Sequence, residues 1–253
     1  EPLFLTNLGV YAVTTSDISG EKYSQNRSYY LDGKLREEPG LENAFGFVYN
    51  DLYWLCLNGK AYILDGLQPL STDRSAPYST RQYAGFYRTN LPARVMWEKD
   101  GRLWFGSESG KVYRFYADTA DPASYNDDGT AIDAWWTTGY IYGGAFERNK
   151  IFRRISVLVD SLPVTSIELL TRRKGIWESV RRESSGTRYH SWKYTAWSKW
   201  TWRIDETPKS LVTKAKIKKA DKAQYRFRNA ELDEPFSILQ YACEYTTGSY
   251  YKG

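Results

Sequence analysis

The sequence predicts an all-β protein: propeller-like antiparallel meander repeats that form a partial propeller, followed by a β-sandwich or jelly-roll-like domain. The first observation is a fixed spacing of 51 residues between Tyr11, Tyr62 and Tyr113, each of which lies in a pair of apolar strands joined by a polar turn with Gly. The second is the composition, with 17% aromatic residues, because aromatic side chains suit a pleated, half-buried surface. The third is that no stretch of a dozen residues sustains the 3.6-residue apolar period of a helix.

Turn dipeptides separate the strands of the repeated segments. Asn58-Gly59 and Asp100-Gly101 are the strongest signals, because a two-residue hairpin turn needs positive φ at both positions. Asn50-Asp51 and Ser109-Gly110 are expected to turn the chain in the same way. With outer strands expected within 23–31 and 78–88, residues 1–118 should form about two and a half blades.

This blade count raises the question of how the propeller closes. A propeller needs about four blades, because each blade buries its faces against its neighbours. Since the chain begins with Glu1 and not with Met, we expect the missing blades upstream, in a longer polypeptide. The alternative is that the second half of the chain completes the structure.

A polar, turn-rich linker is expected at 119–132, and a β-rich, sandwich-like domain at 133–253. Alternation favours strands there: Tyr225 and Phe227 should face inwards, and Arg226 and Arg228 outwards. The expected strands are 132–142, 152–159, 164–172, 177–183, 197–203, 213–218, 224–228 and 236–245.

Charge is unevenly distributed between the two halves. Residues 1–118 carry 13 Lys and Arg against 14 Asp and Glu, a net charge of −1. Residues 119–253 carry 22 against 16, a net charge of +6. The basic excess favours an anionic partner but is too small to predict nucleic-acid binding by itself. No apolar run approaches the roughly 18–20 residues that would cross a bilayer.

No catalytic residues, cofactor-binding residues or metal ligands are predicted. The single histidine, His190, lies in a loop-like segment, whereas zinc catalysis usually uses two or three His residues. Cys56 and Cys243 are too far apart for a CxxC site, and both are expected to be buried free thiols, with a disulfide as the alternative. The acidic residues near Asp127 do not match a calcium-loop spacing, so 117–131 is expected to be a solvated connector.

Two groups of residues form the candidate interaction surface. The tryptophans could face the core, a protein interface or a bound glycan, since Trp dominates interfaces and its ring can pack on a sugar. The lysines are expected to form a solvated face that protects a strand edge, with contact to phosphate-rich nucleic acid as the alternative. The surface comprises Trp192, Trp197, Trp200, Trp202, Lys214, Lys216 and Lys218.

The chain resembles a family of bacteriophage and prophage virion structural proteins. The resemblance lies in structural motifs such as Gln25-Asn26-Arg27-Ser28-Tyr29-Tyr30, Leu103-Trp104-Phe105-Gly106 and Tyr125-Asn126-Asp127-Asp128-Gly129, and it covers most of the chain. It implies a tail, nozzle or head-to-tail component located in the virion and produced in the bacterial host cytoplasm. It carries no functional residues over to this chain.

The expected function is therefore non-catalytic: protein-protein assembly with other virion proteins, in a homo-oligomeric ring. DNA contact and a membrane span are not expected. The first alternative is a carbohydrate-binding module that attaches to a host surface, with a glycan as partner. The second is a glycoside hydrolase on a propeller, which needs only two suitably separated carboxylates that the sequence cannot rank.

Overall fold

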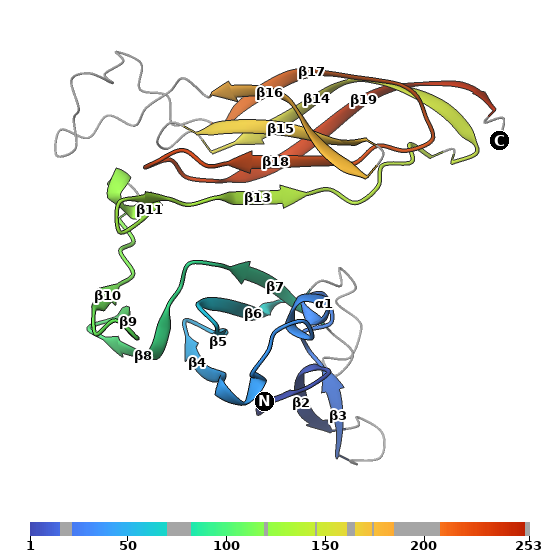
Figure 1. The fold of residues 1–253 in the computed structure, drawn as a ribbon. Coiled ribbons are helices and arrows are strands. Elements are labelled where there is room, and N and C mark those ends of the chain that lie inside the picture. The colour runs from blue at the N-terminus through green and yellow to red at the C-terminus, as the bar shows by residue number, and fades with distance from the viewer. Residues whose placement is uncertain are drawn as a thin grey trace, which may run out of the picture. The chain divides into compact units, whose positions relative to one another are not determined.

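The computed structural model describes residues 1–15, 22–69, 82–118, 121–144, 146–160, 165–173, 175–184 and 208–250. It is 63% strand and 6% helix, and its sheets are antiparallel, which confirms the all-β prediction. The chain divides into two compact units, Glu1–Phe115 and Tyr116–Gly253 (Figure 1).

The first unit consists of three meander sheets that follow one another along the chain. A short helix, α1 (Asp32–Leu35), lies between the first two sheets in sequence. The first sheet contains β1 (Leu3–Thr6), β2 (Gly9–Thr15) and β3 (Lys22–Asn26). The second contains β4 (Phe45–Tyr49), β5 (Leu52–Leu57), β6 (Lys60–Pro69) and β7 (Tyr83–Arg88). The third contains β8 (Ala93–Lys99), β9 (Arg102–Ser107) and β10 (Val112–Arg114).

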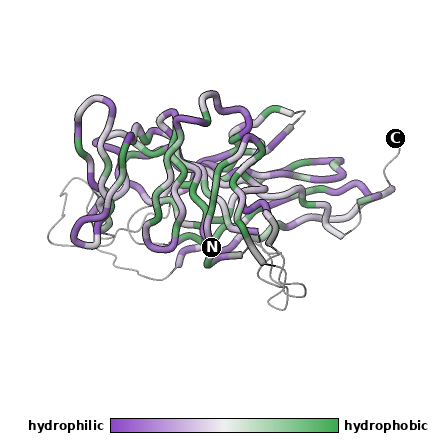
Figure 2. The backbone as a smooth tube through the Cα atoms, turned by 90° about the horizontal axis from the view of Figure 1, so that it is seen from below, coloured by the Kyte–Doolittle hydropathy of each residue, from purple (hydrophilic) through white to green (hydrophobic). Residues whose placement is uncertain are grey.

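The hairpin turns adopt the backbone conformation that the sequence predicts. Both residues have positive φ in Asn50-Asp51 (48° and 62°), Asn58-Gly59 (50° and 70°) and Asp100-Gly101 (53° and 67°). This is the type I′ geometry, whose twist matches that of the flanking strands. In Figure 2, hydrophilic residues gather at such turns and hydrophobic residues lie along the strands.

The 51-residue spacing corresponds to one position in three successive sheets. Tyr11 on β2 pairs with Phe4, Tyr62 on β6 pairs with Leu55, and Tyr113 on β10 pairs with Phe105. The hairpin that carries the tyrosine is therefore repeated, and in each copy the tyrosine lies opposite the equivalent residue of the neighbouring strand. The first sheet has no strand corresponding to β4, and the third none corresponding to β7, among the described residues.

The second sheet is buried on both faces, as a propeller blade is by its neighbours. Leu55, Leu57, Tyr62 and Leu64 pack in one hydrophobic cluster with Val10 of β2 and residues of α1. The alternate residues Trp54, Cys56, Ala61 and Ile63 pack in a second cluster with Met96, Leu103 and Phe105 of the third sheet. Successive side chains of a strand point to opposite faces, so two separate cores share this one sheet.

The second unit is a β-sandwich. One sheet has the order β13 (Ala134–Thr137), β18 (Tyr225–Asn229), β15 (Ser166–Arg173), β16 (Ile176–Ser184). The other has the order β17 (Lys209–Ala220), β14 (Arg148–Val159), β19 (Ile238–Tyr250). Before them lie a 3-10 helix, η3 (Pro122–Tyr125), and a small hairpin of β11 (Asn126–Asp127) and β12 (Thr130–Ala131).

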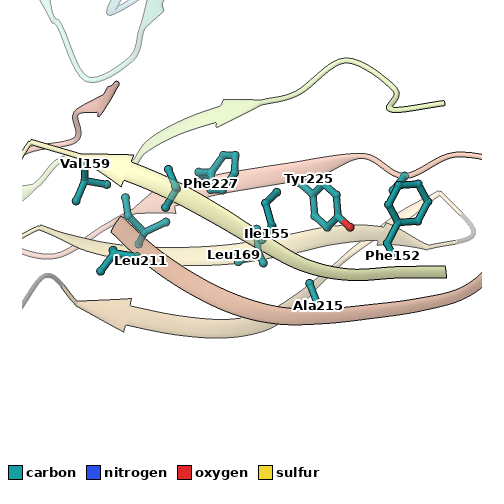
Figure 3. Packing of buried hydrophobic residues seen from close by; sticks show 11 residues of the cluster. Phe152, Ile155, Val159, Leu169, Leu211, Ala215, Tyr225 and Phe227 are labelled. Carbon is teal, nitrogen blue, oxygen red and sulfur yellow. The ribbon is translucent and has the colours of Figure 1, made fainter. Parts of the chain in front are cut away.

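A single core joins the two sheets of the sandwich. Phe152 and Ile155 of β14, with Leu211 of β17, pack against Leu169 and Phe227 of the facing sheet (Figure 3). The predicted alternation on β18 is confirmed, because Tyr225 and Phe227 are buried whereas Arg226 and Arg228 are not. The strand expected at 132–142 was too long: regular pairing spans only Ala134–Thr137, and Ile141 adds an isolated bridge to Ala223.

Candidate functional site

The predicted interaction surface is only partly described. Trp192, Trp197, Trp200 and Trp202, like His190, fall in 185–207, outside the described residues. Lys214, Lys216 and Lys218 lie on the exposed face of β17, which is the terminal strand of its sheet. Their neighbours Thr213 and Ala215 are buried, so alternation places the lysines outwards, as predicted.

The two cysteines are free thiols, as predicted, but only Cys56 is buried as expected. Cys56 is buried in the second sheet, and burial raises the pKa of its thiol to about 12. Cys243 is half-buried, and burial raises the pKa of its thiol too. Since the thiolate is the reactive form of cysteine, both positions are suited to packing and not to nucleophilic chemistry at neutral pH.

The acidic segment at the start of the second unit serves local structure. The carboxylate of Asp121 accepts hydrogen bonds from the backbone N–H of Ala123 and from the hydroxyl of Tyr116, and so caps η3. Asp128 and Gly129 have φ of 49° and 79° and form the turn between β11 and β12. In the described ranges, no group of three or more His, Cys, Asp and Glu side chains could hold a metal ion.

A buried polar network joins the first two sheets. The guanidinium of Arg27, which is fully buried, donates two hydrogen bonds to the Glu1 carboxylate, at 2.7 and 2.9 Å. The hydroxyl of Tyr83 on β7 donates to the same carboxylate. Burial raises the pKa of Glu1, but hydrogen bonds from Arg27 and Tyr83 outweigh it, so the net pKa is lowered. The charged side chains of Arg27 and Glu1 thus have partners within the unit, so this network has a structural role.

Two sheet faces at the ends of the first unit are largely apolar and at least partly exposed, although the guanidinium carbon of Arg114 lies 5.6 Å from the ring centre of Trp104 on the second of them. We call the first the trailing face: Phe4, Tyr11 and Val13 of the first sheet. Phe4 and Val13 are 40% and 39% exposed. We call the second the leading face: Val95, Trp97, Trp104 and Val112 of the third sheet. The Trp97 and Trp104 rings on it are stacked with centroids 6.5 Å apart, and Val95 is 53% exposed.

The repeat relates these faces to buried ones. The register that matches Tyr11 to Tyr62 and Tyr113 also matches Phe4 to Leu55 and Phe105. In the second and third sheets, the residues at these positions are packed against the preceding sheet. Likewise, Trp104 of the leading face matches Trp54, which is packed against the following sheet. Each face is therefore the exposed equivalent of a face that is covered elsewhere in the same unit.

A third exposed feature lies on the outer face of the four-stranded sheet of the sandwich. The guanidinium carbon of Arg226 on β18 lies 4.3 Å from the ring centres of both Trp135 on β13 and Trp177 on β16. The Nε of Arg226 donates to the hydroxyl of Thr137 at 3.0 Å. Trp135 remains 47% exposed despite this contact. A cation over an indole ring is attracted by the ring's negative face, so the three side chains hold one another in place.

Further aromatic and basic side chains continue this surface. Arg172 of β15 donates a weak hydrogen bond of 3.4 Å to the hydroxyl of Tyr140. The ammonium of Lys222 lies 4.6 Å from the ring centre of Tyr140 and 5.8 Å from that of Tyr142. We call the following set the arginine strip: Trp135, Tyr140, Arg172, Trp177, Lys222 and Arg226.

The sequence did not single out the arginine strip. Alternation predicts that Arg226 points outwards, but Trp135 and Trp177 lie about 90 and 50 residues away in the chain. Only the strand order β13-β18-β15-β16 brings them to the same place. The one available signal was the presence of tryptophans on predicted strands whose neighbours carry an outward-pointing arginine.

No protein-family model and no curated sequence matches this chain. Within the described ranges, no helix has the length and apolar character needed to span a membrane. Two carboxylates that do converge, Asp133 and Glu168, both accept hydrogen bonds from the guanidinium of Arg228. In the described part of the chain, the two apolar faces and the arginine strip are exposed features that suit binding.

Proposed function

We propose that this protein is a non-catalytic structural component that works by assembly, with the leading face of one copy packed on the trailing face of another. The observation that carries the proposal is the repeat equivalence of these exposed faces to the two covered faces within the first unit. A contact between copies would then repeat a packing that the chain already makes twice.

This contact is heterologous, because it joins two different patches. Heterologous contacts generate closed rings when the rotation between copies closes, and open filaments when it does not. Exposed apolar patches on a sheet end also carry a risk of aggregation unless a partner covers them. A homo-oligomeric ring covers both faces of every copy, and we propose this state. Upstream blades in a longer polypeptide are the alternative cover for the trailing face.

The resemblance to phage and prophage virion proteins supports a place in a tail, nozzle or head-to-tail structure. Such assemblies are built from rings of identical subunits, which agrees with a heterologous contact. The virion assignment has its own test, mass spectrometry of particles purified from the strain that carries the gene. Absence from the particles would refute this assignment and would leave the assembly proposal standing.

The assembly proposal is tested by the oligomeric state of the full chain. We expect the wild-type chain to form a defined oligomer in sedimentation-velocity and light-scattering measurements. Tyr11→Lys on the trailing face and Val95→Lys on the leading face should each yield monomers, because a buried lysine without a partner is strongly unfavourable. Val212→Lys is the control, since Val212 is equally exposed (51%) but lies on the sandwich.

Mixing the two variants distinguishes this arrangement from a symmetric dimer. The Tyr11→Lys copy retains its leading face, and the Val95→Lys copy retains its trailing face. An equimolar mixture should therefore form heterodimers that neither variant forms alone. A monomeric wild-type chain, or a mixture that stays monomeric while wild type assembles, would refute the proposed contact.

A further inference from the structure

The geometry of the arginine strip points to a binding site for an acidic polysaccharide, one that carries carboxylate groups on its sugar rings. The inference is independent of the proposed assembly, because the strip belongs to the sandwich whereas the leading and trailing faces belong to the first unit. The site would attach the protein to an anionic glycan without cleaving it.

The aromatic side chains supply surfaces on which sugar rings could pack. Trp135, Tyr140 and Tyr142 are 47%, 44% and 43% exposed. An aromatic ring has a negative face, which attracts the slightly positive C–H groups on one side of a pyranose ring. These side chains are also held in position before any ligand arrives, because Arg226 contacts Trp135 and Lys222 contacts both tyrosines. A preformed surface reduces the entropy lost on binding.

The basic side chains supply an attraction for anions. Arg172, Arg226 and Lys222 form no ion pair within 4 Å with any carboxylate in the described part of the chain. Their side-chain partners include hydroxyl groups, aromatic rings and, for Arg172, the amide oxygen of Gln224 at 3.5 Å. A guanidinium that lacks an anionic partner can bind a carboxylate through two parallel hydrogen bonds.

Crowding of like charges supports the same conclusion. Burial lowers the pKa of Arg226, and the positive charge of nearby Arg172 lowers it further, whereas the negative charge of Asp133 partly opposes both. Arg226 remains protonated at neutral pH, so its repulsion from Arg172 destabilises the folded chain. An anion between the two guanidinium groups would relieve that repulsion.

The neighbouring carboxylates favour a glycan over single-stranded nucleic acid. Asp133 and Glu168 flank Arg228 on the same sheet face. Carboxylate oxygens only accept hydrogen bonds, and sugar hydroxyls can donate them. The phosphodiester backbone of DNA has no donor for these acceptors. The mixture of acceptors, cations and exposed rings therefore fits a chain with many hydroxyls and occasional carboxylates.

The test is isothermal titration of the full chain with three defined probes: oligogalacturonate, oligomannuronate and hyaluronan oligosaccharides. We expect at least one probe to bind, and its methyl ester, which keeps the sugar but lacks the charge, to bind about tenfold more weakly. Raising the salt from about 50 to about 500 mM should also weaken binding, because exposed charges are screened.

Matched variants locate the site. Arg172→Gln/Arg226→Gln removes two positive charges from the strip and should weaken binding by about tenfold or more. Lys214→Gln/Lys218→Gln removes two charges from β17 and should change the affinity less than about twofold. Trp135→Ala should weaken binding, whereas Trp135→Phe should retain part of it. Circular dichroism of each variant checks that it is folded.

Four results would overturn the inference. The first is that none of the three probes binds wild type, and the second is that a probe and its methyl ester bind equally well. The third is that the two double variants lose the same amount of affinity. The fourth is that an oligothymidylate of twelve nucleotides binds more tightly than the glycans and that the strip variant abolishes this binding. The last would assign the strip to single-stranded nucleic acid. The ester and salt comparisons use wild type alone, so a variant that misfolds does not prevent a decision.

Discussion

The two units of this chain use β-sheets in different ways. In the first unit, the middle sheet is apolar on both faces and packs against a sheet on either side. In the second, each sheet contributes one apolar face to a single core, and the outer faces carry charged residues such as Arg226 and Lys214. Among the described residues, the first and third sheets of the first unit each leave one face uncovered, whereas the two sheets of the second unit cover each other.

The residue patterns of the strands reflect this difference. Leu52–Leu57 of β5 is a continuous apolar run, as expected when both faces of a strand are covered. Lys209–Ala220 of β17 alternates between apolar and polar residues through most of its length, as expected when one face meets water. The outermost faces of such a stack stay apolar and exposed unless something covers them, which is the basis of the proposed assembly.

The most severe test of this comparison uses adjacent residues of β6. Ile63 and Leu64 point to opposite faces of the middle sheet, and both are buried. Ile63→Ala and Leu64→Ala should each lower the free energy of unfolding of the first unit by about 2–5 kcal/mol, because each leaves a cavity in its own core. Chemical denaturation followed by tryptophan fluorescence measures both. If only one of the two were costly, the middle sheet would not be two-sided.

The corresponding pair in the sandwich should behave asymmetrically. Leu211 of β17 is buried in the core, whereas Val212 is exposed. Leu211→Ala should lower the free energy of unfolding of the second unit by about 2–5 kcal/mol. Val212→Ala should change it by no more than about 0.5 kcal/mol. Similar losses at both positions would mean that the outer face of β17 is covered in solution.

Several parts of this contrast could be predicted from the sequence. Asn58-Gly59 and Asp100-Gly101 indicated hairpins because few residues tolerate positive φ, and the structure confirms both. Alternation gave the inward positions of Tyr225 and Phe227, which are buried. These signals are local: each depends on the conformational preference of one or two residues, or on the two-residue period of a strand.

Features that depend on strand order could not be predicted. The arginine strip requires β13 and β15 to lie on either side of β18, an order that no local pattern specifies. The contact of Arg27 with Glu1 and Tyr83 likewise joins residues far apart in the sequence. The hairpin at Asp128-Gly129 could have been predicted from its turn, but the polar residues around it favoured a connector.

Acid should affect the first unit through Glu38, next to its middle sheet. Burial raises the pKa of Glu38, but hydrogen bonds from Lys60, Asn58 and Tyr62 outweigh it, and the net pKa lies below the usual value of 4.5. Because the folded-state pKa is depressed, the carboxylate stabilises the fold above about pH 4.5, and this contribution is lost as pH falls through the lower, folded-state pKa.

Glu38→Gln tests this pH dependence. The variant should lower the free energy of unfolding by about 1–2 kcal/mol at pH 7, since it weakens charge-assisted hydrogen bonds. The difference from wild type should shrink as the pH falls below about 4. Glu108→Gln is the control, because its ion pair with Arg94 is exposed and should contribute less than about 0.5 kcal/mol. A loss that is constant from pH 7 to pH 3 would show that packing, and not charge, is responsible.

The smallest expected effect on stability is at the lysine face of β17. Lys214→Ala removes an exposed side chain and should change the free energy of unfolding by less than about 0.5 kcal/mol. It should nevertheless lower solubility, because a lysine on a terminal strand discourages pairing with the sheet of another molecule. Light scattering against protein concentration measures this effect, with Lys34→Ala on α1 as a charge-matched control. Equal aggregation of the two variants would mean that net charge alone keeps the sandwich soluble. Selective aggregation of the β17 variant would show that the sandwich uses charge to prevent sheet contacts of the kind that we propose for the first unit.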